Sequence, residues 1–173
     1  MLKESKATAH AGNDTSALAF SAHDHGHCCD RLIARAEALV ASRGARLTPV
    51  RRRVLEILAT DHRAFGAYEI LEHLATSGFG NQPPVAYRAL DFLVENGLAH
   101  RIDRLNAFMA CAHPGRAHDP AFLICRTCNA VAEAPGPAIF AAISAAGEAA
   151  GFAVERMTAE AVGLCPACKD RAQ

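Results

Sequence analysis

The chain has 173 residues, of which 51% are hydrophobic and 6% are aromatic, and its 18 basic and 18 acidic side chains leave no net charge. This length fits one domain or two small ones, and no apolar run of about 18 residues could span a membrane. A net charge of zero gives no support by itself for nucleic-acid binding, because dedicated DNA-binding domains are often strongly basic.

Residues 1–28 are rich in Ala, Ser, His, Gly and Asp and show no periodicity, so we expect a mobile tail. They lack the apolar stretch of a secretory signal. With seven cysteines, an odd number, this indicates a cytoplasmic protein whose cysteines bind metal or do redox chemistry rather than form disulfides. The segment from His23 to Cys29 could capture metal, although a flexible polar stretch with adventitious affinity explains it more simply.

Apolar residues at helical spacing predict four helices in the next part of the chain. The helices are expected over residues 30–43, from Pro49 onward, over about 67–76, and from Pro83 to about 96. Strand-like runs follow at 98–102 and 107–110, joined by a four-residue turn. Helices followed directly by a hairpin are typical of a winged helix-turn-helix, in which one helix enters the major groove and the hairpin flanks it. We therefore predict a DNA-binding domain over residues 29–110.

An arginine-rich segment lies at the start of the second predicted helix. Five arginines occur within eleven residues with no carboxylate between them: Arg43, Arg46, Arg51, Arg52 and Arg53. A solvated helix face would also explain such a run. Its place beside a helix-turn-helix pattern favours phosphate contacts by Arg46 and Arg51–Arg53. On the fourth helix, Tyr87 and Arg88 lie opposite the apolar face and are expected to reach base edges, where arginine can pair with guanine.

A second, smaller domain follows a predicted hinge at residues 111–119. Strands at 121–124 and 130–133, a helix at 137–150 and a strand at 152–163 indicate an α/β domain over residues 120–173, so the chain as a whole is predicted to be α+β. The Ala-rich helix has a narrow apolar face suited to packing on a sheet. A core of about 60 residues would be marginally stable alone.

Two Cys-x-x-Cys pairs, Cys125 with Cys128 and Cys165 with Cys168, flank this domain. Each pair places two sulfurs on one tight turn, and four thiolates form a closed tetrahedral zinc site with no open position. We therefore predict a structural zinc ion that ties the first strand of the domain to the last. A redox dithiol or unbound cysteines remain the alternative.

The order of these parts, the two Cys pairs and the segment Pro-Pro-Val-Ala-Tyr-Arg-Ala-Leu at 83–90 together resemble the ferric uptake regulator family of bacterial metal sensors. Over about residues 30–170 the chain is most similar to the zinc uptake regulator branch. The resemblance implies a homodimer with an N-terminal winged helix and a C-terminal dimerisation domain. It also implies a repressor of zinc uptake genes that binds inverted-repeat operator DNA when zinc is present. Val85 and Ala86 stand where the family usually has threonine and valine.

The resemblance also implies a regulatory zinc site, and hence about two zinc ions per subunit. The matching positions are His100 on the wing, Cys111 at the hinge, and His118 and Glu133 in the second domain. These ligands suit Zn²⁺; the thiolate disfavours Mn²⁺ and Mg²⁺ but does not exclude Co²⁺ or copper. Singly, each residue has an ordinary alternative: a surface histidine, a core cysteine or a solvated glutamate. A metal bonded to both domains would fix their relative orientation.

Other functions remain to be compared with this one. An iron- or peroxide-sensing member of the family, or a constitutive DNA-binding protein with purely structural zinc, would share the fold. An enzyme is not expected, since the His-x-Glu of zinc deaminases is absent and the second site already has four ligands. We accordingly expect no small-molecule substrate and no membrane partner.

Overall fold

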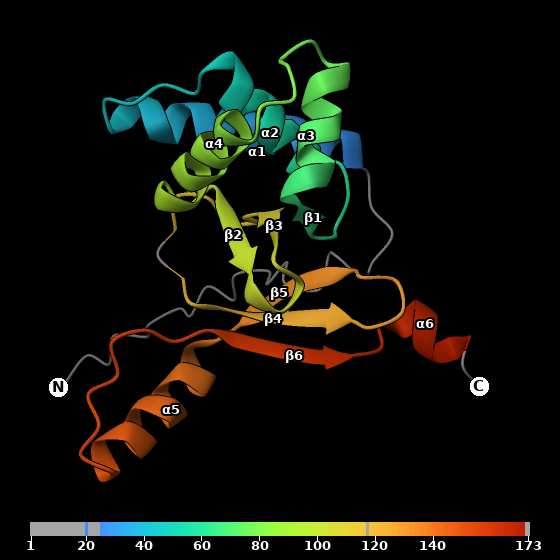
Figure 1. Cartoon of the computed structure of the whole chain (residues 1–173). Helices are drawn as coiled ribbons and strands as arrows, with labels where there is room; N and C mark the ends of the chain where they lie inside the picture. Colours follow the sequence, from blue (N-terminus) through green and yellow to red (C-terminus); the bar gives the residue numbers. More distant parts are fainter. Residues whose placement is uncertain (1–19, 21–24, 117, 172–173) are drawn as a thin grey trace, which may run out of the picture.

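The computed structural model describes residue 20, residues 25–116 and residues 118–171 (Figure 1). Most of the expected mobile tail, including His23, lies outside these residues. Helix α1 spans His25–Ser42, so it begins earlier than its apolar periodicity predicts. Within the described residues, no helix combines the length and the apolar character that a membrane crossing requires.

The N-terminal domain contains four helices and a small sheet. After α1 come α2 (Pro49–Ala59), α3 (Ala67–Thr76) and α4 (Pro83–Glu95), with strands β1 (Phe65–Gly66), β2 (Ala99–Ile102) and β3 (Ala107–Ala110). Proline stands in the first turn of α2 and of α4, where its missing N–H is not needed. Gly97, at a φ of 66°, turns the chain from α4 into β2. The apolar faces of the four helices share one buried core.

The wing is the hairpin of β2 and β3, and a third strand extends it. β1 pairs with β3, giving a sheet of order β1-β3-β2. A short 3₁₀ turn, η2 (Asp103–Leu105), forms the wing tip, and Asn106 closes it in the left-handed region at a φ of 46°. The sequence pattern did not predict β1, because two residues are too few to show alternation.

The C-terminal domain is a three-stranded sheet with two helices. Its elements are β4 (Pro120–Cys125), β5 (Val131–Pro135), α5 (Pro137–Ala149), β6 (Ala159–Gly163) and α6 (Pro166–Asp170), and the sheet order is β5-β4-β6. β5 is antiparallel to β4, whereas β6 returns through α5 to lie parallel to it. The strand predicted over 152–163 is therefore wrong in its first part, because pairing starts at Ala159.

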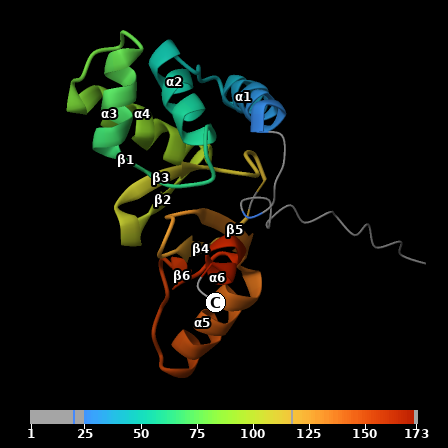
Figure 2. The same cartoon turned by 90° about the vertical axis from the view of Figure 1, so that its right-hand side faces the viewer.

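Helix α5 does not cover its own sheet in the way its apolar face predicts. None of its residues is buried, and Ile139 and Ile143 are 43% and 41% exposed. Figures 1 and 2 show α5 on the far side of the C-terminal sheet from the winged domain. The apolar face of α5 is thus largely exposed in this chain.

The wing packs against the opposite face of that sheet. Side chains of the two domains form one apolar cluster, contributed by Ala64, Ile102, Ala107, Met109, Phe122, Ile124 and Val131. The amide of Val131 donates a hydrogen bond to the carbonyl of His62 at 3.1 Å, and Arg63 forms a β-bridge with Ala130. The hairpin, which the winged-helix pattern places beside DNA, is therefore engaged by the second domain (Figure 1).

Candidate metal centres and DNA-binding surface

The four cysteines of the two Cys-x-x-Cys pairs converge beyond one end of the C-terminal sheet. One sulfur atom from each lies within 4.8 Å of the others, and Cys128 Sγ is 3.7 Å from Cys165 Sγ. Sulfurs at the corners of a tetrahedron with Zn–S bonds of about 2.3 Å lie about 3.8 Å apart. Cys125, Cys165 and Cys168 are buried and Cys128 is exposed. The cluster has the size and ligand set of a closed zinc site.

The positions of these sulfur atoms are set by the two local turns that carry the Cys pairs. The amide of Asn129 donates to the carbonyl of Cys125 at 3.0 Å, and Asn129 takes a φ of 57°, which closes the first turn. Cys165 is the N-cap of α6, with Pro166 following it. Backbone N–H groups, first that of Cys165, lower the pKa of Cys125 to about 6. Burial, followed by the other cysteines, raises the pKa of Cys168 to about 12.

The second predicted ligand set also lies together, between the domains. Single ligand atoms of His100, Cys111, His118 and Glu133 all lie within 4.8 Å of one another. His100 is on β2, Glu133 is on β5, and Cys111 and His118 lie in the connection between β3 and β4. This set includes residues from both sides of the domain interface.

Distances within this set match a small tetrahedral site. His100 Nε2 lies 3.3 Å from Glu133 Oε1, and Cys111 Sγ lies 3.5 Å from His118 Nε2. Bond lengths of about 2.0–2.1 Å to nitrogen or oxygen and 2.3 Å to sulfur give tetrahedral edges of about 3.3–3.6 Å. The observed separations suit one ion shared by the four residues.

Hydrogen bonding orients these ligands and leaves two atoms unsatisfied. His118 Nδ1 lies 2.8 Å from the carbonyl of Arg116, so a proton on Nδ1 leaves Nε2 free to bind metal. The amide of Ala112 donates to Glu133 Oε1 at 2.8 Å. In the part of the chain that the structure describes, His100 Nε2 and Glu133 Oε2 are the buried side-chain atoms without a hydrogen-bond partner. A cation at this point would satisfy both.

The charges of the set are arranged around Glu133. Burial raises the pKa of Glu133, but the neighbouring His100, the Ala112 amide and His118 outweigh burial and lower it overall. Burial, together with the charge of Glu133, raises the pKa of Cys111 to about 12. Cys111 is therefore a neutral thiol at neutral pH and must lose its proton to become a metal ligand.

His113 lies beside the four ligands, although the resemblance gave it no part in the set. Its Nδ1 is 3.7 Å from Glu133 Oε2, and its ring centroid is 5.9 Å from that of His118. The Cys-x-His spacing at 111–113 was the sequence signal for this neighbour.

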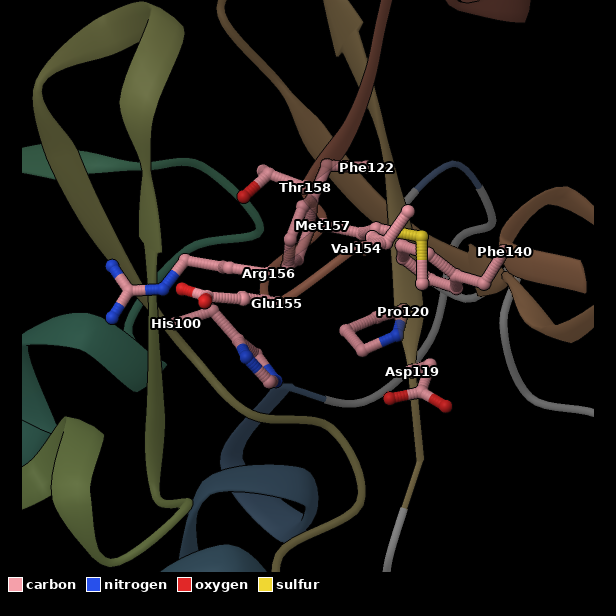
Figure 3. A pocket seen from close by; sticks show the side chains of 10 residues that line it. All are labelled: His100, Asp119, Pro120, Phe122, Phe140, Val154, Glu155, Arg156, Met157 and Thr158. Atoms are coloured by element: carbon pink, nitrogen blue, oxygen red, sulfur yellow. The ribbon is translucent and has the colours of Figure 1, made fainter. Parts of the chain in front are cut away.

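On another side of His100, a cleft of about 390 Å³ opens between β4, α5 and residues 154–158 (Figure 3). The cleft thus reaches His100, whose side chain is 18% exposed, whereas Cys111 and Glu133 are buried.

Three arginines of the arginine-rich segment contact other side chains of this chain, which the sequence pattern did not indicate. Arg52 pairs with Glu37 and with Glu56, and Arg53 bonds Ser77 Oγ at 2.9 Å and Glu56 at 3.3 Å. The Arg51 guanidinium lies 3.5 Å from the ring centroid of Phe92 on α4.

Four of the predicted DNA-contacting residues are exposed: Arg46, Arg52, Tyr87 and Arg88. Arg46 lies in the connection before α2, and Tyr87 and Arg88 lie near the start of α4. Arg51 Nη1 donates to the carbonyl of Arg46 at 3.1 Å, which holds the connection against α2. Among the described residues, no carboxylate pairs with Arg46 or Arg88, in contrast to Arg52 and Arg53.

Comparison with known proteins gives consistent matches. Residues 42–161 match the model of the ferric uptake regulator family. The chain is 36% identical over 138 residues to the zinc uptake regulation protein of Escherichia coli K12, covering 79% of this chain and 81% of that protein.

Solved structures match at both domains. A zinc uptake regulator complexed with zinc and DNA is 34% identical, with a TM-score of 0.79, over 83% of this chain and 97% of that one. The crystal structure of holo XcZur is 36% identical, with a TM-score of 0.73, over 82% of this chain and 99% of that one. The likeness therefore extends through the winged domain, the hinge and the C-terminal sheet.

Proposed function

The chain belongs to the ferric uptake regulator family, and from this premise we propose that it is a zinc-responsive transcriptional repressor that controls zinc uptake genes. It binds operator DNA as a homodimer in the cytoplasm and is not an enzyme. The similarity to a zinc uptake regulator complexed with zinc and DNA supports both the metal and the DNA.

The observation that carries this function is the position of the second ligand set. His100 belongs to the wing, whereas Glu133 belongs to the C-terminal sheet, and the two side chains lie 3.3 Å apart. A bound zinc ion would hold these ligands at fixed separations. His100 and Cys111 then keep the winged domain in one orientation, and the two recognition helices of a dimer stay at the spacing of two half-sites. Operator and zinc must strengthen each other's binding by the same factor.

The two ligand sets have different roles in this proposal. The four-cysteine set stabilises the C-terminal domain, and the mixed set responds to zinc, so each subunit holds two ions when repressing. The thiol of Cys111 favours zinc over Mn²⁺, which prefers oxygen ligands. An iron- or peroxide-sensing role has no comparable observation in its favour.

Exposed apolar side chains support the homodimer. On the C-terminal domain, five large side chains are more than 40% exposed: Leu123, Ile139, Ile143, Phe152 and Val162. Such a concentration on a small domain marks an interaction surface. A second copy that covers it would place one winged domain on each side of the dimer.

The test is selection of bound duplexes from a random DNA pool, with excess zinc and with a weak chelator that spares the thiolate site. We expect enrichment of an inverted repeat only with zinc. His100→Ala and Cys111→Ser should remain dimeric, keep one zinc per subunit and bind the selected duplex poorly even in excess zinc. A wild-type zinc response in both variants would overturn the proposed function.

A further inference from the structure

The wing tip is held by a carboxylate from the C-terminal sheet. Glu160 on β6 accepts two backbone hydrogen bonds, from the amide of Asp103 through Oε1 at 2.7 Å and from the amide of Arg104 through Oε2 at 2.9 Å. These two amides lie at the start of the 3₁₀ turn of the wing. N–H groups at the start of such a turn have no carbonyl acceptor within the turn. One side chain of the second domain therefore satisfies both donors.

Glu160 lies in the same row of the sheet as Glu133. Phe122 on the central strand is paired with Glu133 on one side and with Glu160 on the other. Residues directly opposite one another on neighbouring strands project from the same face, so both carboxylates point toward the wing. The ring of Phe122 lies between them, 5.3 Å from the ring of His100.

The wing is thus held at two places. Its base, at His100 and Cys111, meets Glu133 and the other ligands of the mixed set. Its tip meets Glu160, and the apolar cluster around Ile102 and Met109 lies at the same interface. The hydrogen bonds at the tip involve no residue of either ligand set, so they can form without zinc.

We propose that Glu160 is a positioning residue that holds the wing tip on the C-terminal sheet and so sets the zinc concentration at which operator is bound. This inference rests on the proposed function. The tip contact raises the fraction of protein in which the four ligands already lie together. Zinc binds that fraction, so losing the contact lowers the apparent zinc affinity without removing any ligand.

The experiment titrates zinc against operator binding of the full-length dimer, using a duplex selected by the wild-type protein. Glu160→Ala should raise the zinc concentration for half-maximal binding by roughly tenfold, as expected for losing hydrogen bonds to a charged acceptor. Binding at saturating zinc should return close to wild type, in contrast to His100→Ala. Glu148→Ala, an exposed carboxylate on α5 outside both ligand sets, is the matched control and should leave the midpoint unchanged.

A second pair of variants tests the same bonds from the wing. Asp103→Pro removes one donor N–H, and Ile102 before it already has the extended backbone, φ −102° and ψ 101°, that a following proline requires. Asp103→Ala keeps the N–H and loses only the side chain. The proline variant should shift the zinc midpoint in the same direction as Glu160→Ala, whereas the alanine variant should not.

Hydrogen exchange of the Asp103 and Arg104 amides supplies a readout independent of DNA. Both amides should exchange faster in Glu160→Ala than in the wild-type dimer. An unshifted midpoint in Glu160→Ala, or a shift without faster exchange at these amides, would overturn the proposal while leaving the zinc-responsive repressor in place. A wild-type dimer with no zinc response would instead overturn the proposed function, and this inference with it.

Discussion

At the scale of single residues, Glu133 on β5 contacts groups from both the wing and the hinge. Its carboxylate lies within 3.7 Å of three histidines, His100, His113 and His118, and accepts the amide of Ala112. Only 4% of its side chain is exposed. Three imidazoles around one carboxylate exceed what a tetrahedral ion with a thiolate needs, so one histidine has a different role.

The prediction for these histidines distinguishes a ligand from a neighbour. His118→Ala should lose the second zinc ion, because His118 Nε2 lies 3.5 Å from Cys111 Sγ and its Nδ1 is fixed by the Arg116 carbonyl. His113→Ala should bind two ions and change zinc affinity only slightly. Zinc content per subunit measures both. A severe loss of zinc in His113→Ala, with none in His118→Ala, would mean that His113 is the ligand and His118 its neighbour.

Arginine variants should separate base recognition from phosphate contact. Arg88→Ala should weaken operator binding by about 1–3 kcal/mol and relax the preference at one base position. Arg46→Ala should weaken binding to all DNA sequences alike and reduce the dependence of the binding constant on salt concentration. Arg52→Ala serves as the comparison and should have the smaller effect, because Arg52 is paired with Glu37 and Glu56. Anisotropy titrations at several salt concentrations provide the measurement, and equal effects of Arg88→Ala and Arg46→Ala would contradict the assignment.

At the scale of elements, the sequence predicts those helix and strand boundaries that local residues, such as proline and glycine, determine. Helices α2 to α5 begin at proline or glycine boundaries, and Gly97 ends α4, so the positions of these helices follow from the pattern. Helix α6 was not predicted, because five residues are too few to show a helical period. The strand predicted from Phe152 begins instead at Ala159, because pairing with β4 decides where a strand starts and no local signal records that partner. The exposure of α5 has the same cause, since its apolar face identifies a contact but not the chain that supplies it.

The start of α5 tolerates no added atom. A Cβ at Gly136 would lie 2.2 Å from the backbone oxygen of Asp119 and 2.5 Å from the ring of Phe140. Gly136→Ala should therefore destabilise the protein by about 1–3 kcal/mol. Gly163→Ala is the control, because nothing lies within 4 Å of its added Cβ. Thermal unfolding compares the two, and equal midpoints would show that the backbone at Gly136 yields at little cost.

At the scale of the whole molecule, we expect the four-cysteine set to decide whether the C-terminal domain folds. Cys165→Ser should lose the structural zinc, unfold that domain and yield monomers or aggregates, since structural zinc contributes about 10–16 kcal/mol in small domains. Cys29→Ser, in α1 and outside both ligand sets, should stay a dimer. Light scattering with metal analysis distinguishes them. A well-folded dimer of Cys165→Ser would remove the structural role.

The sequence predicts one candidate site directly, a second only through the resemblance, and other contacts not at all. Two matched Cys-x-x-Cys pairs identify one ligand set directly, because the spacing itself forms the chelating turn. His100, Cys111, His118 and Glu133 have no such spacing, and only the resemblance connected them. The pairing of Arg52 with Glu37 and the hydrogen bond from Arg53 to Ser77 were beyond reach, because Glu37 lies on α1 and Ser77 follows α3. The pairs of both arginines with Glu56 are local, since Glu56 stands four and three residues further along α2. Glu160 shows no sequence signal at all, since its partners are backbone amides.

The parallel pairing of β6 with β4 also dictates the order in which a growing chain acquires structure. β4 remains without this neighbour until α5, β6 and the second Cys pair have been synthesised, whereas the winged domain is complete when Ala110 has emerged. Domains generally fold as units during synthesis, N-terminal first. Each nascent polypeptide is therefore expected to complete its winged domain before the C-terminal domain that we propose forms the dimer. If the proposed function holds, an isolated winged domain would bind one half-site weakly, so we expect a newly made copy to repress only after its second domain has folded.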